Sequence, residues 1–123
     1  MSKAKDKGTK FETLIKDYFL SQNFDCERQA QSGKNDIGDL KIWLVDAVFE
    51  LKNYAQLHLP EWIRETERER QQAKRKYGFT IFKKRGTQKP EEQYVLMTVG
   101  QLSQLLKELY PAAVKEDDGE DLF

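Results

Sequence analysis

The chain has 123 residues, of which 34% are charged and 38% hydrophobic, so we expect one globular domain with a modest core. No apolar run approaches the ~20 residues of a membrane span, and no hydrophobic segment follows the basic N-terminus, so we expect a cytoplasmic protein without a secretory signal or a membrane partner. A single cysteine and a single histidine exclude an internal disulfide and a zinc site built on those residues. Any metal should therefore sit on oxygen ligands, which favours Mg²⁺ or Mn²⁺.

The net charge of zero hides a strong segregation of charge along the chain. Residues 112–123 hold five acids and one base, so the other 111 residues carry 20 bases and 16 acids. Ten of those bases lie between Arg64 and Lys89, against three acids. A basic flank with an acidic tail is typical of a surface that binds a polyanion.

The N-terminal third predicts a helix followed by a strand. We assign residues 1–7 to a flexible basic arm and 8–111 to the folded domain. The sequence Thr9-Lys10-Phe11-Glu12 has the form of a capping box, so a helix should begin there. Its apolar residues recur at helical spacing as far as Phe19, and the helix should end near Asn23. Residues 24–29 are expected to form a first strand.

The middle of the chain predicts a β-hairpin. Residues 30–38 are polar and contain two glycines, so they should form a surface loop. Two apolar runs follow, Leu40–Val45 and Ala47–Asn53, which we interpret as strands joined by a turn near Asp46.

The C-terminal half predicts a helix, two strands and a last helix. Pro60 suits the first turn of a helix running to about Tyr77, with Gly78 placed to end it. Residues 79–83 and 94–98 are short apolar strands, separated by a basic loop. A final helix over 99–110 should bury four leucines and be stopped by Pro111; these are Leu102, Leu105, Leu106 and Leu109. Residues 112–123 are expected to be a disordered acidic tail.

These elements, in the order αβββαββα, predict an α/β fold with a central mixed, mainly antiparallel sheet flanked by helices. On the third strand, Glu50 and Lys52 lie roughly 7 Å apart on one face, while Phe49 and Leu51 point into the core. We expect the two charges to face the first helix and the loop, where Asp39 on the neighbouring strand can reach them. Two carboxylates can bind Mg²⁺, and Lys52 can position water or stabilise negative charge that develops on a phosphate.

The Glu50-Leu51-Lys52 triplet is not specific by itself, since Asp39-Leu40-Lys41 is a second instance of the same pattern. A hairpin with a solvated charged face is the plain alternative. What favours a site is the context: an acid upstream, a glycine-containing approach and a preceding helix that carries Glu12. Asp36 competes with Asp39 for the first metal position, and we prefer Asp39 because it adjoins the apolar run. Glu12 has the competing role of capping its own helix.

Taken together, a helix with Glu12, then Gly38-Asp39 on one strand and Glu50-Leu51-Lys52 on the next, resembles the PD-(D/E)XK nuclease superfamily. More narrowly, the chain is similar to the Holliday junction resolvases of phage and archaeal type. The similarity covers about residues 8–110. The segments that carry it are Glu50-Leu51-Lys52-Asn53, Leu59-Pro60-Glu61-Trp62, Lys83-Lys84-Arg85-Gly86 and the strand Tyr94-Val95-Leu96-Met97-Thr98.

This resemblance implies a metal-dependent endonuclease that resolves four-way DNA junctions as a homodimer, in a bacterial or phage-infected cytoplasm. It implies Asp39, Glu50 and Lys52 as catalytic residues with Glu12 beside them, and it implies Asp39, Glu50, Glu12 and Leu51 as metal positions. Two departures stand out. Gly38 occupies the place of the superfamily's proline, and the Gln-x-x-x-Tyr element of the exonuclease branch is missing.

The remaining expectations concern contacts with DNA and with other proteins. Candidate DNA-binding residues are Arg28, Ser32, Lys34, Asn35, Lys83, Lys84 and Arg85. The tail ends Asp121-Leu122-Phe123 and resembles two bacterial recognition elements, the sliding-clamp-binding peptide and the tip of single-strand-binding proteins. A plain solvated tail is the alternative. Two other functions stay open: another endonuclease or nickase of the same superfamily, and a non-catalytic DNA-binding adaptor.

Overall fold

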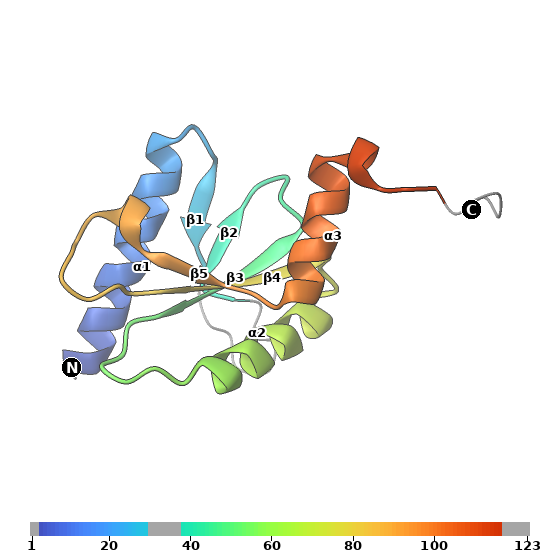
Figure 1. Ribbon diagram of the computed structural model, residues 1–123. Coiled ribbons are helices and arrows are strands. Elements are labelled where there is room, and N and C mark those ends of the chain that lie inside the picture. Colours follow the sequence, from blue (N-terminus) through green and yellow to red (C-terminus); the bar gives the residue numbers. More distant parts are fainter. Residues whose placement is uncertain (1–2, 30–37, 117–123) are drawn as a thin grey trace.

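The computed structural model describes residues 3–29 and 38–116. One sheet lies at the centre, with a layer of helix on each of its two faces (Figure 1). In chain order they are α1 (Lys3–Ser21), β1 (Cys26–Arg28), β2 (Leu40–Ile42), β3 (Ala47–Lys52), α2 (Leu59–Ala73), β4 (Tyr77–Phe82), β5 (Tyr94–Leu96) and α3 (Val99–Leu109), with 3₁₀ turns η1 at Pro90–Glu92 and η2 at Pro111–Ala113.

The sheet has five strands in the order β1-β2-β3-β4-β5. Only the β3–β4 pair is parallel, and α2 is the crossover that a parallel pair needs. The other three pairs are antiparallel. The expected α/β domain with a mixed, mainly antiparallel sheet and flanking helices is therefore confirmed at that level.

The alternation of side chains along β3 decides what each helix covers. Phe49 and Leu51 belong to the core cluster that α1 closes with Phe11 and Ile15. Glu50, one residue out of phase, points to the other face, where α2 lies. The core is thus under α1, and the charged residues of β3 lie under α2 rather than toward α1 and the loop as we predicted.

Polar and aromatic contacts hold α2 on its face of the sheet. The hydroxyl groups of Thr66 and Thr80 are hydrogen-bonded at 2.6 Å, and both side chains are buried. Trp62 is buried against Phe82, with ring centroids 5.5 Å apart. Because these contacts fix both the height and the rotation of α2, they also fix which of its other residues face β3.

Two predicted helix boundaries are wrong. Helix α1 begins at Lys3, not at the Thr9 capping box, so it includes residues 3–7 that we assigned to an arm. Helix α2 ends at Ala73 because Lys74 takes the left-handed conformation (φ 56°) and closes the helix. Gly78 belongs to β4 instead, where a Cβ would lie 3.0 Å from the methyl group of Thr66, so glycine lets α2 approach the strand.

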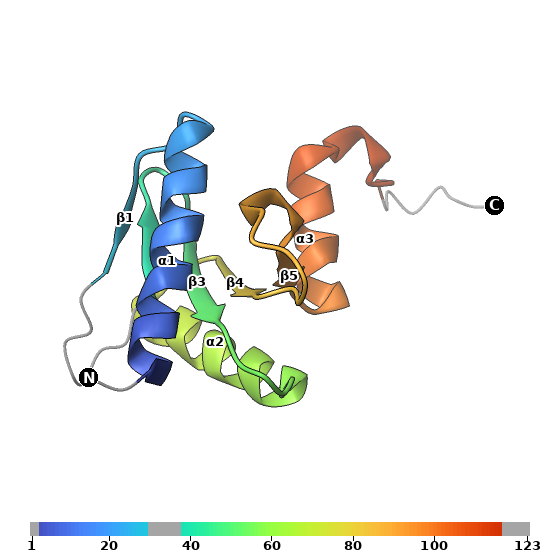
Figure 2. The same cartoon turned by 90° about the vertical axis from the view of Figure 1, so that its left-hand side faces the viewer.

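The prediction that α3 buries its four leucines is also wrong. No residue of α3 is buried, and only Leu105 packs against the core cluster. Figure 2 shows α3 standing at the β4–β5 side of the molecule, well away from α1. Thr98 caps the helix by accepting a hydrogen bond from Gln101 N–H. The helix stops before Pro111, as expected. None of the helices in the described ranges is long and apolar enough to span a bilayer.

Candidate active site

The residues singled out from the sequence lie around one pocket. A hollow of about 340 Å³ is lined by Glu12, Asp39, Glu50 and Lys52, together with Glu65 of α2. A larger hollow of about 450 Å³ beside the β2–β3 turn has Asp46 as its one carboxylate. The 340 Å³ pocket is therefore the candidate site, since it brings acids from four elements or their flanks together with the ammonium group of Lys52.

Asp39 is held by the backbone of β3 through both its own backbone and its side chain. Its N–H donates to Phe49 C=O at 2.7 Å, and its Oδ2 accepts from Leu51 N–H at 2.8 Å. Gly38 makes this close approach possible: its φ is 96°, and a Cβ there would lie 2.9 Å from the Phe49 oxygen. Leu51, which the resemblance places among the metal positions, has its side chain in the core and uses its backbone N–H to orient Asp39.

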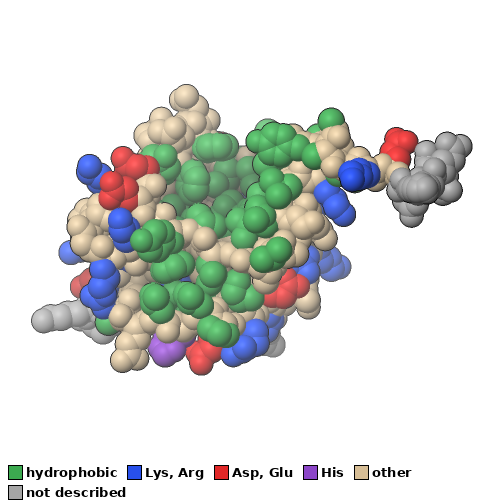
Figure 3. Space-filling view, in the orientation of Figure 1, with side chains coloured by type: hydrophobic (Ala, Val, Ile, Leu, Met, Phe, Trp, Pro, Cys, Tyr) green, Lys and Arg blue, Asp and Glu red, His purple; other side chains and the backbone are tan. Residues whose placement is uncertain are grey.

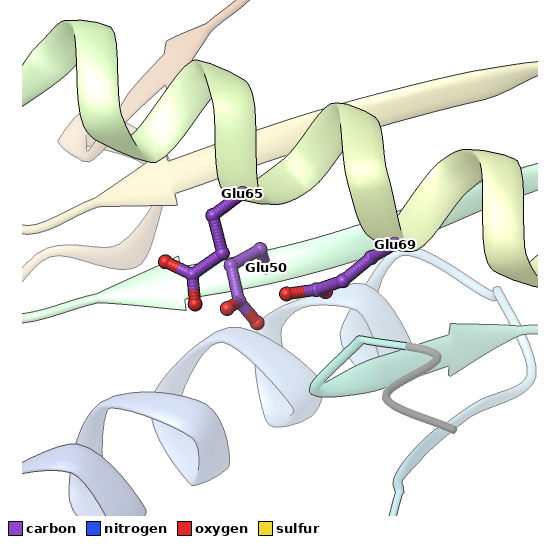
Figure 4. Close-up of side chains that lie close together, drawn as sticks. All are labelled: Glu50, Glu65 and Glu69. Atoms are coloured by element: carbon purple, nitrogen blue, oxygen red, sulfur yellow. The ribbon is translucent and has the colours of Figure 1, made fainter. Parts of the chain in front are cut away.

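Glu50 is the most crowded acid of the site. It is 3% exposed, and its Oε1 has no hydrogen-bond partner among the described residues. Burial, then the hydrogen bond and charge of Asp39, and then the charge of Glu69 hold the pKa of Glu50 far above its usual range. Figure 4 shows Glu65 and Glu69 reaching from α2 toward Glu50 on β3. The arrangement favours a proton or a cation among these carboxylates.

Lys52 supplies the positive charge next to Glu50. Its Nζ lies 3.3 Å from Glu50 Oε2 and 2.6 Å from Glu65 Oε2. Burial by itself lowers the pKa of Lys52, but the hydrogen bond to Glu65 and the charge of Glu50 outweigh it and raise the pKa above its ordinary value. Lys52 is therefore a fixed ammonium group and not a proton acceptor at neutral pH.

Glu12 reaches the pocket from α1, where Arg28 of β1 binds it. The Arg28 Nη2 and Nε each lie 3.0 Å from Glu12 Oε1. Burial and the charge of Asp39 raise the pKa of Glu12, and Arg28 opposes them. Glu12 does not cap its helix, because α1 begins nine residues before it, so the competing role considered from the sequence does not apply. Arg28, a candidate DNA contact, is engaged by Glu12 here.

One group of three carboxylates among the described residues is compact enough to hold a divalent cation: Glu50, Glu65 and Glu69, whose ligand atoms all lie within 4.8 Å of one another. Asp39 and Glu12, the partners of Glu50 expected from the sequence, line the same pocket but do not belong to this group. Oxygen donors of this kind suit Mg²⁺ or Mn²⁺, and the Oε1 of buried Glu50, which has no hydrogen-bond partner among the described residues, is available to such an ion.

Sequence reasoning did not single out Glu65 and Glu69 as site residues. Glu69 is only 2% exposed, and Glu65 carries the shortest bond to Lys52. A signal was present: residues 62, 65, 66 and 69 share one helical face, and Trp62 already marks that face as inward. Extending the face through polar residues would have found both acids.

The basic residues proposed to contact DNA after β4 each contact a different part of the protein. Lys83 Nζ donates to the backbone oxygens of Lys84 and Thr87, so its ammonium holds the loop after β4. Lys84 lies over the ring of Tyr94, and Arg85 donates to Ala55 C=O at the rim of the acidic pocket. Ser32, Lys34, Asn35 and the tail end Asp121–Phe123 lie outside the described residues.

A second pocket adjoins the acidic one and is lined by cations. It measures about 410 Å³, and its charged lining residues are Lys7, Lys10, Lys83 and Arg85. Lys7, Asn53 and Tyr54 line both pockets. Helix α1 therefore supplies Lys7 and Lys10 to this cationic pocket. From the sequence we had assigned these two lysines to the flexible arm or to the residues just after it.

A scan against models of known protein families finds no match to this chain. Searches of curated proteins and of solved structures find no match either.

Proposed function

We propose that this chain is a metal-dependent DNA endonuclease that resolves four-way junctions by hydrolysing phosphodiesters. The observation that carries the proposal is the single pocket in which buried Asp39 and Glu50 lie beside Lys52 and Glu12. A buried cluster of acids with one fixed ammonium is costly for a fold and is typical of sites that bind a cation or perform catalysis.

Each residue has a role that its contacts support. Asp39 and Glu50 would hold Mg²⁺ or Mn²⁺, with Glu12 or Glu65 completing the set. Such an ion supplies Lewis-acid chemistry, activating water and neutralising charge on the phosphate. Lys52 stays charged, so of the roles open to it the structure favours stabilising negative charge on the phosphate over accepting a proton.

The neighbouring cationic pocket supports a nucleic-acid substrate. Lys7, Lys10 and Arg85 line this pocket, which shares Lys7, Asn53 and Tyr54 with the acidic pocket. A DNA backbone laid across the cationic pocket would bring a phosphate to the acids, because phosphate contacts position a duplex without reading its sequence. The choice of four-way junctions over other DNA rests on the resemblance described above.

The test is cleavage of a labelled four-way junction and of a matching linear duplex in Mg²⁺, Mn²⁺ or EDTA. We expect paired nicks on the junction only, none in EDTA, and a loss of at least ~100-fold in rate for Asp39→Asn. Asp46→Asn is the matched control, because Asp46 lies at the opposite end of β3 in an exposed ion pair with Arg75. Its rate should be unchanged.

Two outcomes would replace the proposal. Equal cleavage of the linear duplex would indicate another endonuclease or nickase with the same metal chemistry. Junction binding without cleavage under any metal would indicate a DNA-binding adaptor, and the acidic pocket would then have only a structural role.

A further inference from the structure

One side of α3 is fastened to its own domain. The Gln101 side chain donates to Gly78 C=O at 2.7 Å and accepts from Gly78 N–H at 2.8 Å, so it extends the backbone pairing of β4. Glu108, two turns further on, forms an ion pair with Lys76. Leu105 lies on the same side and packs against the core. These contacts set the rotation of α3 about its axis.

The rest of the apolar arc of α3 faces outward. Val99 is 82% exposed and Tyr110 is 60% exposed, and three leucines accompany them. Two of these leucines line a groove of about 420 Å³ between α3 and η2, whose residues are Val99, Leu102, Ser103, Leu106, Lys107, Tyr110, Ala113 and Val114. Figure 3 shows hydrophobic side chains gathered over β5 and α3 on this face, with the surface hollowed beside α3. We call these eight residues the α3 face.

The chemistry of the α3 face indicates what covers it. Its residues are apolar or small, and Lys107 is the one charged group that lines the groove. A two-fold contact sets each patch against its own copy, so a charged patch would repel itself and a neutral one does not. Partners recognised through charge have almost nothing to bind here, although the rest of the surface is rich in charge.

The spacing on the helix points to the same occupant. Residues 99, 102, 106 and 109 are apolar at alternating steps of three and four, which is the pattern of a seam between two packed helices. Leu105 packs against the core, whereas Val99, Leu106 and Tyr110 remain exposed. A second helix with the same pattern fits beside it.

We propose that the α3 face is the contact surface of a homodimer, in which the α3 helices of two copies pack side by side about a two-fold axis. The pairing would bury the outward row of each helix and continue across the exposed side chains of β5, Tyr94 and Val95. It leaves the acidic pocket open, because none of the residues that line that pocket belongs to the α3 face. This inference does not depend on the nuclease activity.

Analytical ultracentrifugation of the full chain over a range of concentrations tests the proposal. We expect a reversible dimer for the wild type and a dissociation constant at least ~100-fold higher for Leu106→Glu, because each dimer would bury two carboxylates. Leu44→Glu is the matched control, because Leu44 is fully exposed in the β2–β3 turn. The dissociation constant of this variant's dimer should equal that of the wild type.

A second variant separates loss of the dimer from loss of the fold. Val99→Asp places an acid in the first turn of α3, where it favours the helix, at a position that is mostly exposed in the single copy. It should weaken the dimer while circular dichroism shows an unchanged helix content. A monomeric wild type at ~100 µM would overturn the proposal, and so would a dimer that withstands both Leu106→Glu and Val99→Asp.

Discussion

Replacing Glu50 by Gln should stabilise the protein in EDTA even as it removes metal-dependent cleavage. The buried carboxylate lies among Asp39, Glu65 and Glu69, so the folded chain holds a proton on it well above its ordinary pKa of 4.5. Gln is close in shape to the protonated acid, and its amide can donate to neighbouring carboxylates. The variant therefore folds without having to take up a proton.

The size of the effect follows from that proton. At about pH 8, binding it costs ~1.4 kcal/mol for each of the roughly 3.5 pH units above 4.5, or about 5 kcal/mol at most. We reduce this to about 2 kcal/mol, because the Lys52 ammonium 3.3 Å away offsets part of the cost of ionising Glu50 instead. For a domain of this size, 2 kcal/mol corresponds to a rise of roughly 8 °C in Tm.

The assay is a set of thermal melts of wild type and variant at about pH 8, in EDTA and in Mg²⁺. In Mg²⁺ the wild type should recover the difference, since an ion at ~100 times its Kd stabilises by about 2.7 kcal/mol and the Gln variant binds it poorly. Glu27→Gln, at an exposed position of β1, is the matched control and should change Tm by less than ~2 °C. A lower Tm for Glu50→Gln in EDTA, with the control unchanged, would refute the idea that Glu50 is a crowded acid.

Three further predictions concern the same pocket. In EDTA the wild-type Tm should fall between about pH 5 and about pH 9. Burial and neighbouring acids raise the pKa values of Glu50 and Glu12 above 4.5, so the stability that their protonated forms give the fold is complete below pH 4.5 and is lost as the pH rises. A Tm that does not change with pH would contradict this. Gly38→Ala should lower the free energy of unfolding, measured by urea denaturation, by about 2–4 kcal/mol, because the new Cβ would meet the Phe49 oxygen. Gly86 also has a positive φ but has no heavy atom within 4 Å of a Cβ, so Gly86→Ala should lower it by about 1 kcal/mol. Equal decreases for the two variants would show that the Phe49 contact does not matter. Lys52→Gln should lower the single-turnover cleavage rate by ~10²–10³-fold while junction affinity stays within about threefold, and an unchanged rate would remove Lys52 from the chemistry.

Several features of this protein follow from local sequence. Pro60 and Pro111 mark the start of α2 and the stop after α3, as expected. The alternation of β3 places Glu50 and Lys52 on one face and Phe49 with Leu51 on the other, and that was predictable because strand periodicity does not depend on neighbours. The convergence of Asp39 on Glu50 also followed from the hairpin, since β2 and β3 pair as expected.

Other boundaries depended on distant contacts. Glycine commonly ends a helix, yet Gly78 lies within β4. The Gln101 side chain from α3 is hydrogen-bonded to its backbone, and α2 crosses close above it. Lys74 closes the helix instead, in a conformation that local propensity disfavours. The Thr9 capping box has no effect on where α1 begins, since a good cap only competes with the helix continuing upstream.

The sequence by itself determined the chemistry of the candidate site: an acid before one strand, an acid and a lysine on the next, and a helix carrying Glu12. Only the tertiary structure decided which surfaces meet. It set β3 against α2, which placed Glu65 and Glu69 around Glu50, and it turned the apolar arc of α3 outward. The physical reason is that periodicity defines the face of an element, whereas the partner of that face is chosen by long-range contacts such as Thr66 to Thr80 and Gln101 to Gly78.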